Sequence, residues 1–198
     1  MVCDALIVGG GPAGSTCART LRQAGWNVVV MDRATFPRNK VCAGWVTPGV
    51  FRLLDLDPAE YRATGLTIQD ITGFRTSVMG GGAVETRYPR IISYAIRRFE
   101  FDDFLLRRAH VCVRSSTPLT SLERRGDAWV ANGGITARVV VGAGGHFCPV
   151  ARHIRGTLVH GTGPRDIAGA GEIYGQRLFS KILQKRDDWR RRAAWERR

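Results

Sequence analysis

The 198-residue sequence lacks the features of two large protein classes. No apolar run reaches the roughly 18 residues that a membrane-spanning helix requires. No basic region precedes the first apolar segment, so we expect no cleaved signal peptide and a cytoplasmic location. The 5 cysteines include no Cys-x-x-Cys pair, so we expect them to be reduced, with Cys3, Cys17 and Cys112 buried as small hydrophobic residues. A helical membrane protein and a disulfide-stapled secreted domain are therefore not expected.

Motifs for metal binding and for hydrolysis are also missing. The 4 histidines show no metal-ligand spacing, and His146 with Cys148 alone is not a zinc motif. Neither Ser15 nor Ser93 lies in a nucleophile elbow. We therefore expect no metal site and no hydrolase.

Acidic residues are scarce, with 17 Asp and Glu against 30 Lys and Arg and a formal net charge of +13. This charge is compatible with nucleic acid, an anionic membrane or an anionic cofactor, and it does not choose among them. Hydrophobic residues make up 44% and charged residues 24% of the chain, as in a globular protein. At about 150 residues per domain, the length predicts one domain, or two at most.

A glycine-rich loop between two apolar segments carries the clearest motif. Residues 5–8 have the composition of a buried strand, and loop 9–14 reads G-x-G-x-x-G. Residues 13–24 repeat apolar positions every three or four residues, which predicts a helix. A second strand follows at 28–31 and ends at Asp32. Strand, loop, helix, strand and acid together predict a dinucleotide-binding βαβ unit.

Each residue of the loop has a physical role in such a site. Gly9 permits the tight turn, Gly11 lets the backbone approach a pyrophosphate, and Gly14 lets the helix pack closely on the strand. Pro12 and Ala13 open the helix, whose N–H groups and positive dipole end favour the bound anion. The loop therefore predicts a pyrophosphate site.

Asp32 predicts the ribose end of the same site. A carboxylate at the end of the second strand accepts both hydroxyls of an adenosine ribose, and it repels a 2′-phosphate. The fingerprint leaves NAD and FAD open.

Three further segments carry a family resemblance. Residues 32–44 contain an acid-basic pair and F-P-R-x-K-x-C-x-G, residues 98–109 read R-x-x-F-D-x-x-L-x-x-x-A, and residues 139–152 contain V-V-G-A-G-G with a downstream arginine. Over about residues 3–152, the chain resembles the geranylgeranyl-reductase-like FAD-dependent oxidoreductases. They belong to the aromatic-ring-hydroxylase-type flavoprotein superfamily.

The resemblance implies an α/β fold with a FAD/NAD(P)-binding Rossmann-like domain, built from βαβ plus a β-meander, and part of a β-sheet substrate region. It implies FAD bound in an extended form, with basic and loop residues of the three segments along it. By position these are Arg33, Arg38, Lys40, Cys42, Arg98 and Gly142. A solvated basic loop is the alternative interpretation of the first three.

The resemblance also implies the activity. NAD(P)H would reduce FAD, and the flavin would pass hydride to a small hydrophobic, unsaturated substrate of isoprenoid type. Two alternatives stay open: a flavin-dependent monooxygenase, and a truncated FAD- or nucleotide-binding remnant without activity. Gly144 stands where the family has Asp, and residues 153–198 contain no later G-D motif, so we expect an N-terminal portion of a longer flavoprotein.

Residues 1–152 are expected to form the FAD-binding domain, with 45–97 as a partial substrate-region insertion. The expected elements are strands within 65–94, an amphipathic helix at 99–109, and meander strands at 119–122, 128–130 and 135–141.

Residues 153–198 form a basic tail with 11 Lys and Arg against 5 Asp and Glu. Three interpretations stay open: a non-native tail, a solvated helix from about residue 176, or a basic amphipathic helix on an anionic membrane or RNA. No specific nucleic-acid binding is expected, because no stacking motif accompanies the charge.

Overall fold

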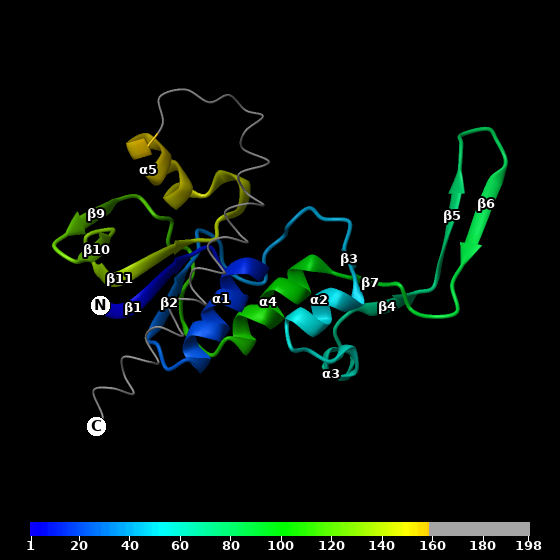
Figure 1. Cartoon of the computed structure of the whole chain (residues 1–198), viewed down its shortest axis with the longest axis horizontal. Helices are drawn as coiled ribbons and strands as arrows, with labels where there is room; N and C mark the ends of the chain where they lie inside the picture. The colour runs from blue at the N-terminus through cyan, green and yellow to red at the C-terminus, as the bar shows by residue number, and fades with distance from the viewer. Residues whose placement is uncertain (159–198) are drawn as a thin grey trace. The chain divides into compact units, whose positions relative to one another are not determined.

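The computed structural model describes residues 1–158, and the chain divides into two units, 1–153 and 154–198. Figure 1 shows that the first unit contains both strands and helices. The strands are β1 Val2–Val8, β2 Val28–Met31, β3 Trp45–Val46, β4 Ile68–Ile71, β5 Gly73–Ser77, β6 Ala83–Arg87, β7 Ser93–Ile96, β8 Cys112–Arg114, β9 Leu122–Arg125, β10 Ala128–Ala131 and β11 Ile135–Gly142. The helices are α1 Pro12–Gln23, α2 Pro48–Leu53, α3 Pro58–Ala63, α4 Arg98–Arg108 and α5 Pro149–Leu158, with a 3-10 turn at Gly145–Phe147.

The main sheet has the order β8-β2-β1-β11-β10-β9. The first four strands run parallel, whereas β10 pairs antiparallel with β11 on one side and with β9 on the other. Leu6 of β1 pairs with Val29 of β2 on one side and with Val140 of β11 on the other. This arrangement confirms the α/β class, the βαβ unit and the meander. It also brings the carboxyl ends of β1, β2 and β11 to one edge, where open α/β sheets bind ligands.

Both faces of β1 are buried, which explains its continuous apolar sequence. Ile7 packs on the side of α1 and α4, against Leu21 and Leu106. Leu6 faces the opposite side, in a cluster that includes Cys148 and Val150. The glycine loop therefore begins from a rigid strand.

Residues 45–97 form two smaller sheets and two short helices. One sheet has the order β3-β7-β4, and the other pairs β5 with β6. An aromatic cluster of Phe51, Tyr61 and Phe101 joins α2 and α3 to α4. The expected strands of 65–94 and the helix near 99–109 are confirmed, whereas α2, α3 and β8 were not predicted.

Two expectations were wrong. The strand expected at 119–122 is Leu122–Arg125, because the Asn132 side chain binds the N–H groups of Thr120 and Ser121 and holds them in a loop. Cys112 is exposed rather than buried, since it lies on the edge strand β8.

All five cysteines are free, with Cys3 and Cys148 buried and Cys17 partly buried. Within residues 1–158, no helix combines the length and the apolar character needed to cross a membrane. The helix expected from about residue 176 lies outside the described residues.

Candidate functional site

The glycine loop lies where β1 ends and α1 begins, beside the end of β11. Gly9 has φ +114°, and a Cβ on it would lie 2.4 Å from the carbonyl oxygen of Ala143. Gly14 is equally constrained, because a Cβ there would lie 1.8 Å from the carbonyl oxygen of Gly9. Both positions therefore require glycine, for the turn and for the close approach of helix to strand.

The N-terminus of α1 offers backbone donors to an anion. Gly11 is the N-cap and has no side chain to accept a hydrogen bond, and Pro12 follows at the first helical position. The N–H groups of Ala13 and Gly14 in this first turn have no carbonyl four residues earlier within the helix. They point out of the helix end together with the positive end of its dipole.

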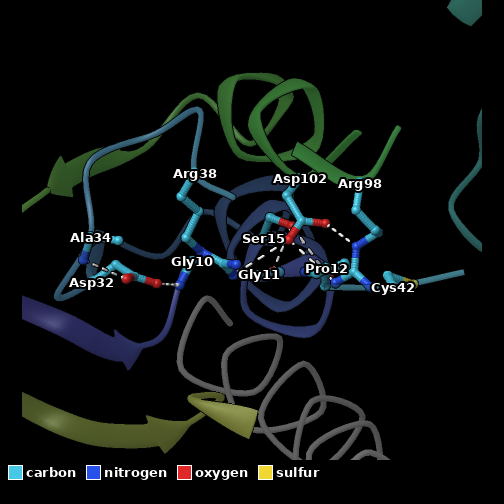
Figure 2. A network of polar contacts seen from close by, with 10 residues as sticks. All are labelled: Gly10, Gly11, Pro12, Ser15, Asp32, Ala34, Arg38, Cys42, Arg98 and Asp102. Carbon is cyan, nitrogen blue, oxygen red and sulfur yellow. Dashed lines mark hydrogen bonds and ion pairs between the residues drawn. The ribbon is translucent and has the colours of Figure 1, made fainter. Parts of the chain in front are cut away.

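Asp32 follows β2 and is 9% exposed. Its Oδ2 accepts a hydrogen bond from the N–H of Gly10 at 2.7 Å, and its Oδ1 accepts one from the N–H of Ala34 at 2.9 Å (Figure 2). An ionised carboxylate has about four acceptor positions, so each oxygen can accept one further hydrogen bond. The carboxylate is thus fixed at the mouth of the loop and still able to accept ribose hydroxyls.

A second acid, Asp102 of α4, joins two of the predicted basic residues. Its carboxylate is buried, with Oδ1 2.6 Å from Nε of Arg98 and Oδ2 3.4 Å from Nη2 of Arg38. The hydrogen bond with Asp102 raises the pKa of the Arg98 guanidinium, which stays charged. The Arg38 guanidinium also lies over the Phe36 ring, 4.9 Å from its centroid.

Cys42 ends this network. Its exposed Sγ lies 3.4 Å from the N–H of Gly44 and 3.4 Å from Nη1 of Arg98. Both donors stabilise a thiolate, so the hydrogen bond from Gly44, followed by that from Arg98, lowers the pKa of Cys42.

The structure brings together only part of the predicted set. Asp32, Arg38, Cys42 and Arg98 join the loop in one network, together with Asp102 (Figure 2).

Three other predicted residues are not part of this network. The side chains of Arg33 and Lys40 are exposed. Gly142 makes room for packing, because a Cβ there would lie 2.9 Å from Sγ of Cys148.

Neither Asp102 nor the N–H of Gly10 was predicted to belong to the site. Asp102 is the acid of the R-x-x-F-D segment and lies four residues after Arg98. On a helix this spacing favours an ion pair, so the sequence did indicate that Arg98 and Asp102 could pair.

The residues present fit the ADP half of a dinucleotide. At the start of α1, a Cβ on Gly11 would meet only the Arg38 guanidinium, 3.1 Å away, and no side chain caps the helix. The buried Asp32 keeps acceptor capacity at the same loop. Among the described residues, no group of three or more His, Cys, Asp or Glu is placed to hold a metal ion.

Comparison with known proteins agrees with this geometry. The menaquinone reductase of Mycobacterium tuberculosis is 39% identical over 104 residues, which cover 50% of this chain and 25% of that protein. The geranylgeranyl diphosphate reductase of Rhodobacter capsulatus is 35% identical over 109 residues, covering 55% and 26%. The crystal structure of halogenase PltM in complex with phloroglucinol and FAD has a TM-score of 0.61 at 19% identity, covering 77% of this chain and 36% of that one. The matched part of the chain spans about a quarter of the length of these two curated relatives.

Sheet order, glycine loop and acid define a Rossmann-type dinucleotide-binding fold, and solved structures of FAD-binding flavoproteins share it. Residues 4–100 match the model of the FAD dependent oxidoreductase family. This part of the chain belongs to that family, and its relatives include geranylgeranyl reductases and halogenases.

Proposed function

We propose that the chain provides the ADP-binding part of a flavoenzyme in which NAD(P)H reduces FAD and the flavin reduces an unsaturated isoprenoid compound. One observation carries the nucleotide part: the buried Asp32 carboxylate is bound to the N–H of Gly10 at the mouth of the glycine loop. The substrate class is supported by two relatives named for reducing menaquinone and geranylgeranyl diphosphate, because both compounds carry a polyisoprenoid chain.

The chain's own residues bind and orient the cofactor in this proposal. Asp32 accepts the hydroxyls of the adenosine ribose and disfavours a 2′-phosphate by charge repulsion. The N–H groups of Ala13 and Gly14 bind the pyrophosphate, and Arg38 and Arg98 offset its charge. Bound FAD supplies the hydride-transfer chemistry.

The proposal includes a cytoplasmic location with peripheral membrane contact through basic residues 153–198, because a polyisoprenoid substrate partitions into membranes. The excess of 11 Lys and Arg over 5 Asp and Glu in this segment supports contact with anionic lipid. Co-flotation with phosphatidylserine vesicles at low salt, lost at high salt, is the expected result. Absence of co-flotation at low salt would contradict this part.

An anaerobic reduction experiment tests the activity. FAD-loaded protein is mixed with NADH or NADPH, and a geranylgeranyl-bearing substrate is then added. We expect bleaching of the flavin absorbance by the nicotinamide and its recovery on adding the isoprenoid substrate. Recovery that requires oxygen and yields an oxygenated product would favour the monooxygenase. Absence of bleaching would contradict reduction by NAD(P)H.

A further inference from the structure

Asp102 lies outside the glycine fingerprint, yet it is completely buried, with 0% of its surface exposed. It lies on α4, which follows the 45–97 segment in the chain and packs beside α1. A buried carboxylate costs free energy unless it is paired and hydrogen-bonded. The residues that pair with Asp102 therefore indicate the role of its buried carboxylate.

Those partners are two arginines from different parts of the chain. Arg98, one turn earlier on α4, places its Nε 2.6 Å from Oδ1 and its Nη2 3.3 Å from Oδ2. Arg38, from the loop after β2, places its Nη2 3.4 Å from Oδ2. Two guanidinium groups and one carboxylate leave a single net positive charge on the three side chains.

Arg38 reaches the end of α1 that offers backbone donors. Nη2 of Arg38 lies 3.1 Å from the position that a Cβ on Gly11 would occupy. Figure 2 shows the Arg38 guanidinium near Gly11 and the Arg98 guanidinium bound to the same Asp102 carboxylate. Asp102 thus fixes Arg38 at the anion-binding end of the helix and joins Arg98 to it.

We propose that Asp102 is a positioning residue for the diphosphate of the bound nucleotide. It acts through Arg38, which it holds at the N-terminus of α1, and through Arg98, and does not itself contact the ligand. This inference rests on the proposed nucleotide site and adds a residue that the fingerprint does not contain.

An effect of net charge and an effect of arginine positioning predict opposite changes in ADP affinity for Asp102→Asn. This substitution keeps the shape of the side chain and raises the net charge of the three side chains from +1 to +2. If only charge mattered, ADP would bind more tightly. If Asp102 positions the arginines, ADP binds more weakly, because one of the two acceptor oxygens becomes an NH2 donor that cannot bind a guanidinium group.

The experiment is calorimetric titration of the full chain with ADP. We expect Asp102→Asn to weaken binding about tenfold, which corresponds to about 1.4 kcal/mol. Asp103→Asn, one residue along α4 and paired with Arg107, is the control and leaves binding unchanged. In the Arg38→Ala background, Asp102→Asn should weaken ADP binding by much less than tenfold, because Asp102 can then act only through Arg98.

Equal or tighter binding by a folded Asp102→Asn variant would overturn the positioning role while leaving the nucleotide site intact. Absence of ADP binding by the unmodified chain would overturn both.

A second measurement needs no substitution at Asp102. The Nε–H resonance of Arg98 in nitrogen-15 spectra of the unmodified chain, assigned by comparison with Arg98→Lys, should be protected from exchange and should shift when ADP is added. An unprotected resonance, or one that ADP leaves in place, would overturn the proposal.

Discussion

The carboxylate of Asp32 accepts a 2.7 Å hydrogen bond from the N–H of Gly10, 22 residues earlier in the chain. This bond joins the end of β2 to the loop that leaves β1. A second bond from the N–H of Ala34 fixes the other carboxylate oxygen at 2.9 Å. The acid is therefore oriented before any nucleotide arrives, which reduces the conformational cost of binding.

Replacing Asp32 should separate the ribose part of the site from the pyrophosphate part. Asp32→Asn loses one charged acceptor, so we expect ADP affinity to fall about tenfold to a hundredfold, since a hydrogen bond to a charged group contributes roughly 1.5–3 kcal/mol. Inorganic pyrophosphate, which has no ribose, should bind with less than a threefold change. Calorimetric titration measures both ligands, with Asp127→Asn in the exposed turn before β10 as the control. An equal loss for both ligands would contradict a ribose role.

Gly14 should be the glycine least tolerant of a methyl group. In Gly14→Ala the new Cβ would lie 1.8 Å from the carbonyl oxygen of Gly9, which is backbone and cannot rotate away. We expect the free energy of unfolding, measured by urea denaturation, to fall by about 1–3 kcal/mol. Gly82→Ala, with nothing within 4 Å of its Cβ position, should leave stability within about 0.5 kcal/mol of the unmodified chain. Similar stability of the two variants would contradict the close approach of α1 to the loop.

Cys42 should react with iodoacetamide at lower pH than an ordinary thiol. The hydrogen bonds from Gly44 and then Arg98 lower its pKa, and the side chain is exposed. Rate against pH, followed by mass spectrometry of the Cys42 peptide, should give a midpoint below the 9.0 of an unperturbed thiol. Arg98→Ala should raise that midpoint, whereas Arg97→Ala should not. An unchanged midpoint in Arg98→Ala would exclude this arginine as a donor.

Cys17 should make the fold less stable in alkaline solution. Burial raises the pKa of its thiol from 9.0 to about 11. Between these two values the unfolded chain loses a proton that the folded chain keeps, so stability falls as pH rises, by at most about 2–3 kcal/mol. Cys17→Ala should therefore gain stability relative to the unmodified chain between about pH 8 and about pH 10.5 in urea denaturation. Cys112→Ala controls for the loss of a thiol, and a parallel decline of Cys17→Ala and the unmodified chain would contradict the burial effect.

Local patterns account for what the sequence predicted. The glycine loop, the first helix and Asp32 lie within one short segment, so spacing alone places the acid beside the loop. The meander was found because its strands are separated by glycine turns. Its first strand was misplaced because the side chain of Asn132, 12 residues away from Thr120, decides where the loop ends.

Contacts between distant segments account for what was missed. Arg38 and Asp102 are 64 positions apart, and nothing in either local sequence shows that they pair. The short helices α2 and α3 did leave an indication, since each has a proline in its first turn and Asp57 caps the second. Such six-residue helices depend on the aromatic cluster for their stability, and periodicity does not detect them.

Titration of the purified full chain with FAD is the direct test of the nucleotide site. Visible absorbance after gel filtration and the quenching of flavin fluorescence report binding. We expect about one FAD to be retained per chain, displaced by ADP and lost in Asp32→Asn. A chain that is folded by circular dichroism yet retains no flavin and has no measurable affinity for ADP would contradict the proposed nucleotide site.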